Sequence, residues 1–98
     1  GETYTALGDL SKALGYYEEY HALRKALQVA FPDNVSFQNG LAVSYANLGQ
    51  FHQVSSPEKS REYFLQAEAI WARLVDAFPA YVEFGRNLKA ARGELAAL

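Results

Sequence analysis

The apolar residues of this chain recur every three or four positions, the spacing that places side chains on one face of an α-helix. One stripe runs from Phe37 through Leu41, Tyr45 and Leu48 to His52. No segment alternates apolar and polar residues with the period of two that is typical of a β-strand. The pattern predicts an all-α fold. A second, more aromatic kind of stripe occurs twice, at Tyr16/Tyr17, Tyr20, Leu23, Leu27 and Phe31 and again at Tyr63/Phe64, Ala67, Ile70/Trp71, Leu74 and Phe78.

Residues that begin or end helices divide this pattern into segments. Pro32 and Pro79 mark helix ends, because proline disfavours helical geometry in the residue before it. Ser55-Ser56-Pro57-Glu58 starts a helix, with Ser55 and Glu58 at capping-box spacing. Leu7-Gly8-Asp9 predicts a turn, since glycine accepts a positive φ after a helix and aspartate caps the next one. We therefore expect antiparallel helices joined by short connections, over residues 2–7, 10–31, 34–53, 57–78 and 81–96.

The chain also repeats itself with an offset of 47 residues. Eleven residues between positions 12 and 48 are identical to their partners, including Phe31-Pro32 with Phe78-Pro79 and Leu41 with Leu88. Most of these identities are apolar and helically spaced. A repeat of roughly 20–50 residues indicates stacked copies of one supersecondary unit.

Composition narrows the class of protein. Ninety-eight residues, 50% apolar and 20% charged, are typical of one small globular domain. The net charge of −2 argues against a nucleic-acid partner, and the apolar runs are too short to cross a membrane. The absence of cysteine excludes disulfides and thiolate metal sites. We expect a cytoplasmic protein. Because it begins at Gly1 without methionine or a helix cap, we also expect a fragment of a longer array.

No catalytic arrangement is recognisable, so we expect neither an enzyme nor a cofactor. His21 and His52 lack acidic or histidine partners at metal-ligand spacing; His52 is interpreted as a half-buried packing residue and His21 as a solvated one. Glu18 and Glu19 point to different sides of a helix, which excludes paired-carboxylate chemistry. Trp71 could belong to an aromatic pocket, but its helical spacing favours a core stripe.

Arranged along these helices, the sequence resembles the tetratricopeptide repeat. Small residues are needed where two helices approach to ~8–10 Å, and aromatic residues occur at other fixed positions of the family pattern. Tyr20 departs from a small position, Arg92 stands in place of an aromatic residue, and the 47-residue period exceeds the usual ~34. The matching positions are Gly1, Tyr4, Gly8-Asp9, Ala13 and Tyr17, then Tyr45, Leu48-Gly49, His52, Ser60, Phe64 and Ala67, and finally Leu95 and Ala96.

The resemblance implies an α-solenoid of antiparallel helix pairs, with about two repeats and a terminal helix. It divides the single domain, 1–98, into a partial first repeat with a truncated first helix (1–32), a second repeat (33–79) and a third, capping helix (80–98). HEAT-type repeats match the period, but the spacing of the small residues gives no reason to prefer them.

In this family the first helix of each pair lines a concave groove that binds a protein or peptide. The row on residues 36, 39, 43, 47 and 50 is polar and rich in amides, which would bind a peptide backbone by hydrogen bonds. The alternative is that the row is only a solvated face. The full set that the resemblance assigns to the groove is Glu2, Thr5, Ser36, Asn39, Val43, Ala46, Asn47, Gln50, Gln53, Glu83, Arg86, Ala90 and Glu94.

The function that follows is a scaffold for protein–protein interaction, with no metal, nucleic acid or membrane involved. The rival hypothesis is a structural spacer or self-association element. A truncated first repeat would expose apolar surface near Tyr4 and Leu7, and a homodimer would cover it.

Overall fold

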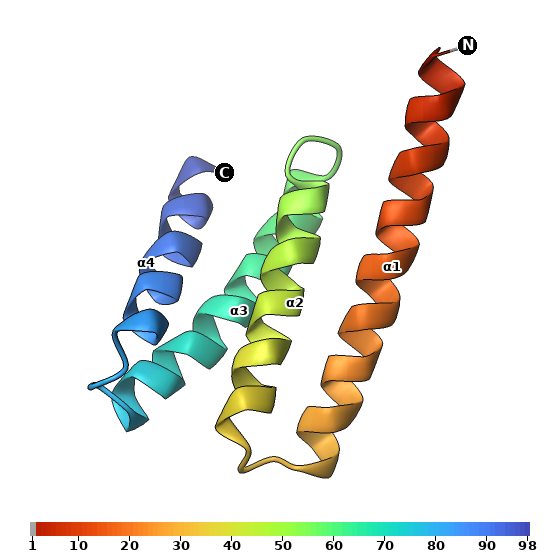
Figure 1. The fold of residues 1–98 in the computed structure, drawn as a ribbon. Helices are drawn as coiled ribbons and strands as arrows, with labels where there is room; N and C mark the ends of the chain where they lie inside the picture. Colours follow the sequence, from red (N-terminus) through yellow and green to blue (C-terminus); the bar gives the residue numbers. More distant parts are fainter. Residues whose placement is uncertain (1) are drawn as a thin grey trace.

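The computed structural model describes the backbone of residues 2–98 and the side chains from residue 9 onward. This part of the chain forms four α-helices and no strand: α1 (Glu2–Ala30), α2 (Val35–His52), α3 (Pro57–Ala77) and α4 (Val82–Ala97) (Figure 1). The all-α prediction is confirmed. From α2 onward the predicted helix boundaries are correct to within a residue.

Each helix runs antiparallel to the one before it, so α1 and α3 share one direction and α2 and α4 the other (Figure 1). Backbones approach most extensively between helices that are consecutive in the sequence. The repeat of the sequence is also a repeat of elements. Helices α1 and α3 end at Ala30 and Ala77, and α2 and α4 begin at Val35 and Val82, in both cases with the 47-residue offset.

The turn predicted at Leu7-Gly8-Asp9 is not formed, because α1 continues through these residues as one 29-residue helix. A glycine inside a helix costs only about 1 kcal/mol relative to alanine. No proline or second glycine stands next to Gly8 to make the break obligatory. The flanking alanine and leucine residues favour helix, and local propensity therefore prevails over the stop signal.

Two helix starts show how the sequence signals work. Asn34 caps α2, its Oδ1 accepting a hydrogen bond from the Phe37 backbone N–H at 3.0 Å. At α3 the predicted capping box is wrong: Ser56, not Ser55, is the cap residue, and its side chain makes no capping hydrogen bond. Pro57 in the first turn has no N–H to satisfy, which reduces the need for a side-chain cap.

The core lies between α2, α3 and α4. Trp71, Leu74 and Phe64 are almost fully buried, which confirms the core-stripe interpretation of the second aromatic segment. Each such side chain contributes about 1.5–3 kcal/mol when removed from water. Among the described residues, every fully buried apolar side chain belongs to these three helices: Leu41, Ala42, Leu48, Phe64, Ala67, Ile70, Trp71, Leu74, Phe84, Leu88 and Ala91.

Helices α2 and α3 pack tightly at Gly49. A β-carbon placed there would lie 2.8 Å from two ring carbons of Phe64, a side chain that is 1% exposed. Beside it, the buried Ser60 hydroxyl donates to the Gly49 carbonyl at 2.7 Å. Ala67, on the same face of α3, is also fully buried. The small residues of the sequence pattern therefore mark the real site of close packing.

Helix α1 packs on α2 through a more polar interface. Tyr17 meets Phe51 edge to face at 6.1 Å between ring centroids. The Arg24 side chain lies against Gly40, and its guanidinium lies 4.8 Å from the centre of the Tyr20 ring. No described residue of α1 is fully buried. This interface excludes less apolar surface from water than the α2–α3 contact does.

The prediction that His21 is solvated is wrong. Its Nδ1 lies 2.9 Å from the buried Ser44 hydroxyl, and its ring lies 4.5 Å from that of Tyr45 between centroids. Since the Ser44 hydroxyl donates its proton to the Leu41 carbonyl at 2.7 Å, the histidine donates from Nδ1. Burial, and secondarily the charge of Lys25, lower the pKa of His21 below its ordinary value.

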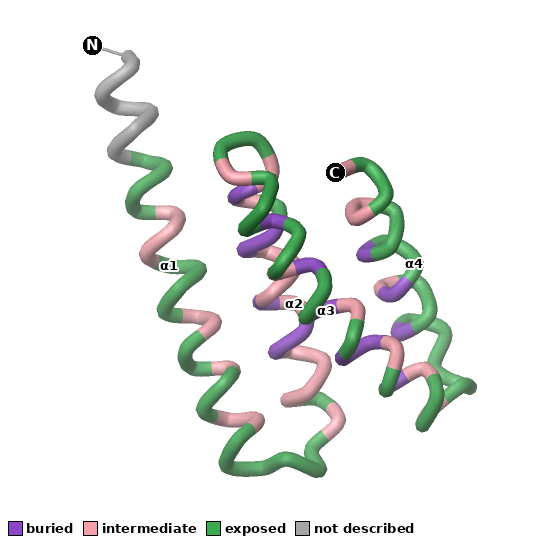
Figure 2. Tube along the Cα trace, turned by 180° about the vertical axis from the view of Figure 1, so that it is seen from behind, coloured by how far each residue is buried: buried purple, intermediate pink, exposed green. Residues whose placement is uncertain are grey.

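The first copy of the aromatic stripe is not a core stripe. Leu23 is 59% exposed, whereas its repeat equivalent Ile70 is 7% exposed. Tyr16 is 70% exposed. The cause is the number of neighbours, because α3 packs between α2 and α4 while the described part of α1 packs mainly on α2 (Figure 2).

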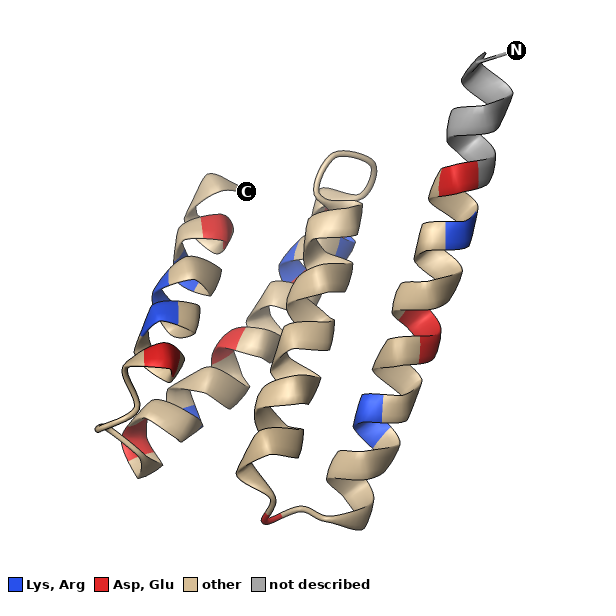
Figure 3. Ribbon diagram, viewed as in Figure 1, with Lys and Arg blue, Asp and Glu red and all other residues tan. Residues whose placement is uncertain are grey.

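Charged residues are absent from α2. Helix α2 carries no Asp, Glu, Lys or Arg, whereas α1, α3 and α4 carry both signs (Figure 3). Among the described side chains one ion pair forms, between Arg92 Nε and Glu68 Oε2 at 3.6 Å. In the same part of the chain, no helix has the length and apolar character needed to cross a membrane.

The contact at Gly49 can be tested with alanine. Gly49→Ala gains helix propensity but overpacks Phe64, so we expect the free energy of unfolding to fall by about 1–2 kcal/mol. Gly93→Ala is the control, since nothing lies within 4 Å of its added β-carbon. It should raise the free energy of unfolding by up to about 1 kcal/mol. Urea denaturation measures both, and equal stabilisation by the two substitutions would contradict the close contact.

The lowered pKa of His21 predicts a pH-dependent stability. As the pH falls, His21 takes up its proton at a higher pH in the unfolded chain than in the folded one. The free energy of unfolding therefore has its full value above the ordinary pKa of 6.5. It falls as the pH drops from that value toward the lowered pKa. In His21→Asn, which keeps a donor near Ser44, urea denaturation between about pH 7.5 and about pH 5.5 should show a smaller loss. An unchanged pH dependence would assign the effect to other groups.

Candidate functional site: the cleft between α2 and α4

A cleft of about 230 Å³ lies between the parallel helices α2 and α4, with α3 as its floor. This α2–α4 cleft is smaller than the ~300–1,000 Å³ that encloses a drug-sized ligand. It is suited to a side chain of a peptide rather than to a whole cofactor. The lining residues are Val43, Ala46 and Gln50 of α2, Phe64 and Trp71 of α3, and Asn87, Ala90, Ala91 and Glu94 of α4.

Small side chains open this cleft. Ala46 on one wall and Ala90 and Ala91 on the other leave the space between the helices unfilled. The floor is closely packed: Trp71 is 4% exposed and its Nε1 donates to Asn39 Oδ1 at 2.8 Å. The cleft thus presents an apolar floor that is already in place before any ligand arrives.

The polar groups of the α2–α4 cleft are two amides and one carboxylate. Gln50 and Asn87 come from opposite walls, and each amide can both donate and accept. Glu94, the one ionisable residue of the lining, accepts a hydrogen bond from Gln53 Nε2. This bond links the end of α2 to α4.

The α2–α4 cleft brings together five of the residues predicted to line the groove. Val43, Ala46 and Gln50 face Ala90 and Glu94 across it, although the two groups lie on different copies of the repeat. Gln53 contacts the site through its bond to Glu94.

The other predicted groove residues do not line this cleft. Asn39 is not a free member of an amide row, because its carbonyl oxygen is engaged by Trp71. Ser36, Glu83 and Arg86 are exposed elsewhere on α2 and α4, and Asn47 is half-buried on α2. The side chains of Glu2 and Thr5, like those of Tyr4 and Leu7, lie outside the described residues.

Sequence reasoning missed Asn87, Ala91 and the floor residues Phe64 and Trp71. Asn87 and Ala91 lie seven and three positions before Glu94, on the helix face that also carries Ala90, so the helical period could have found them. The floor could not be found this way, because apolar spacing does not distinguish a core residue from one that also borders a cleft.

The remaining candidates for chemistry are packing residues. His52 is 8% exposed and its ring stacks on Tyr63 at 5.7 Å between centroids, so the packing interpretation is confirmed with deeper burial than expected. His21 serves the α1–α2 interface described above. Within the described residues, no three His, Asp or Glu side chains are placed to hold a metal ion.

Comparison with known proteins does not extend this description: no family model matches the chain, and neither curated proteins nor solved structures give a significant match.

Proposed function

We propose that this chain is a protein-interaction module of the tetratricopeptide-like solenoid type, and that the α2–α4 cleft binds an extended segment of a partner protein. The observation that carries the proposal is the cleft itself. It brings Val43 and Gln50 opposite Ala90 and Glu94, residues that the repeat pattern had assigned to one binding face.

The chemistry of the cleft favours a peptide. An apolar side chain of the partner would occupy the space above Trp71, where it is removed from water. The amides of Gln50 and Asn87 would exchange hydrogen bonds with the partner's backbone, which every sequence offers. Glu94 would accept from a backbone N–H or from a cationic side chain. Such a site binds with modest sequence preference.

The solenoid part of the proposal is supported by how the helices repeat. Successive helices are antiparallel, and like elements recur at the 47-residue offset. Backbone contacts are concentrated between neighbouring helices, as expected for an array in which each unit packs mainly on the next. The small residues at the α2–α3 contact stand where the family pattern has them.

A selection from random peptides tests the binding role. We expect peptides captured by the unmodified chain to lose at least about tenfold in affinity with Gln50→Ala combined with Asn87→Ala, through the loss of two hydrogen bonds. Ala90→Leu, which fills the cleft from an exposed position, should have a similar effect. The fluorescence of Trp71, the single tryptophan, reports occupancy of the cleft directly.

Asn47→Ala is the matched control, because Asn47 lies on the same helix but outside the cleft. Its affinity should equal that of the unmodified chain. Peptides that bind the cleft variants as well as they bind the control would refute the assignment.

One observation favours self-association as a second candidate. Helix α1 exposes Tyr16 and Leu23, and Phe31 follows its last residue; each is more than half accessible to solvent. Large exposed apolar side chains that lie close together can mark an interface. The face that a second copy would cover lies on the described part of α1, downstream of the Tyr4 and Leu7 positions that the sequence indicated.

Sedimentation equilibrium tests this second candidate. If α1 mediates dimerisation, the unmodified chain should associate in a concentration-dependent manner and Leu23→Glu should be monomeric. Leu65→Glu, at a comparably exposed position of α3, should leave the association unchanged. A monomeric unmodified chain at about 0.1 mM, where weak interfaces are occupied, would exclude it.

A further inference from the structure

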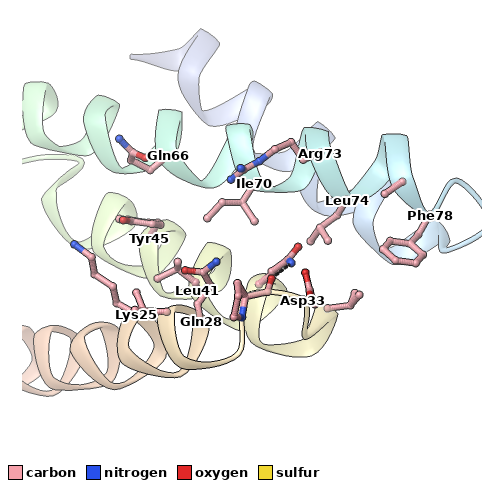
Figure 4. Close-up of a pocket in the computed structure, with 15 residues that line it drawn as sticks. Lys25, Gln28, Asp33, Leu41, Tyr45, Gln66, Ile70, Arg73, Leu74 and Phe78 are labelled. Atoms are coloured by element: carbon pink, nitrogen blue, oxygen red, sulfur yellow. Dashed lines mark hydrogen bonds between the residues drawn. The ribbon is translucent and has the colours of Figure 1, made fainter.

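A second and larger cleft lies on the opposite face of the helix array. Helices α1 and α3 form its walls and α2 forms its floor, and its volume is about 590 Å³ (Figure 4). None of its lining residues borders the α2–α4 cleft. We call it the α1–α3 cleft.

The inner surface of the α1–α3 cleft is apolar and helically spaced. Leu41 and Tyr45 come from successive turns of α2, and Ile70, Leu74 and Phe78 come from successive turns of α3. Residues four apart form a ridge along a helix, and ridges of this kind accept the side chains of another helix. Leu41, Ile70 and Leu74 are buried, whereas Tyr45 and Phe78 are half-buried and remain accessible between α1 and α3.

The length of the α1–α3 cleft agrees with that of a short helix. The α3 wall extends from Gln66 to Phe78, which at a rise of ~1.5 Å per residue is about 18 Å. A partner helix of about three turns would span it. Binding of an amphipathic helix in an apolar groove is a recurring mode of recognition.

The charges on the two walls define the partner's chemistry. Lys25 on α1 and Arg73 on α3 flank the apolar floor from opposite sides (Figure 4). Both are exposed, and neither forms an ion pair with a described residue. Asp33, the one carboxylate of the lining, lies in the α1–α2 loop at the end of the cleft. The amides of Gln28 and Gln66 complete the walls without adding charge.

We propose that the α1–α3 cleft binds an amphipathic helix of a partner protein whose apolar stripe is flanked on both sides by Asp or Glu. The stripe packs on Val29, Tyr45 and Phe78, which are accessible apolar residues of the lining, and the flanking carboxylates pair with Lys25 on one wall and Arg73 on the other. This surface is separate from the peptide site proposed above, so the two can be occupied together.

The charge pattern distinguishes this occupant from a second copy of the chain. The exposed apolar face of α1 around Tyr16 and Leu23 is bordered by Lys12 as well as Glu19. A second α1 would therefore bring a lysine as well as a carboxylate to the two cationic walls. An acidic partner helix brings carboxylates alone, which complement Lys25 and Arg73 better.

Fluorescence anisotropy with a designed probe tests the proposal. The probe is a labelled 14-residue amphipathic helix with a leucine stripe flanked by glutamates, measured at about pH 8 so that His21 is neutral. We expect saturable binding that weakens as the salt concentration rises. A matched probe with lysines in place of the glutamates should bind at least about tenfold more weakly.

Variants of the chain locate the site. Lys25→Glu combined with Arg73→Glu should lower the affinity for the acidic probe at least about tenfold. Lys12→Glu combined with Lys59→Glu, an equal change of net charge at exposed positions outside the cleft, should have little effect. Ala90→Leu, which fills the other cleft, should bind the acidic probe like the unmodified chain. Circular dichroism melts confirm that each variant is folded.

Four results would overturn the proposal. They are absence of binding by the acidic probe, equal binding of the acidic and basic probes, unchanged binding by the Lys25/Arg73 variant, and loss of binding by Ala90→Leu. A fifth is a homodimer of the unmodified chain that the Lys25/Arg73 variant abolishes, because the occupant would then be a second copy. None of these results depends on whether the α2–α4 cleft binds a peptide.

Discussion

The close packing of α2 on α3 at Gly49 determines the rest of this architecture. With no side chain at Gly49, the Phe64 ring packs directly against the α2 backbone, and the Ser60 hydroxyl satisfies a carbonyl that packing removes from water. Once this pair is formed, α3 can hold Trp71 and Leu74 between α2 and α4. Both clefts share these two central helices, each of which is a floor on one face and a wall on the other.

Helix α1 depends on this unit but contributes little to it. It reaches α2 through aromatic, histidine and arginine contacts rather than through buried aliphatic residues. The Nε atom of Arg24 is buried there without a hydrogen-bond partner among the described residues. An unsatisfied buried donor weakens an interface. Because α1 also forms one wall of the α1–α3 cleft, this more polar contact borders the larger of the two clefts, and occupancy of that cleft would stabilise the docking of α1.

The two clefts differ in chemistry because they are built from different helices. The α2–α4 cleft has one carboxylate and two amides around a small apolar space, which suits a peptide backbone and one inserted side chain. The α1–α3 cleft is wider and has a cation on each wall, which suits a helix with acidic flanks. A helical array can in this way present two separate interaction surfaces, one on each face.

The sequence by itself determined the helices and their order from residue 10 onward, since apolar spacing, Pro32 and Pro79, and the Asn34 cap are local signals. The turn that it indicated at Gly8 is not formed. The sequence also located the small residues at the α2–α3 contact and part of one cleft, because repeat-equivalent positions share a face. Tertiary structure decided the rest. Repeat-equivalent stripes become core in α3 and largely surface in α1, because burial depends on how many neighbours a helix has. Likewise, His21 is half-buried because Ser44 of α2 lies opposite it. Residue spacing along one helix carries no information about which helix will face it.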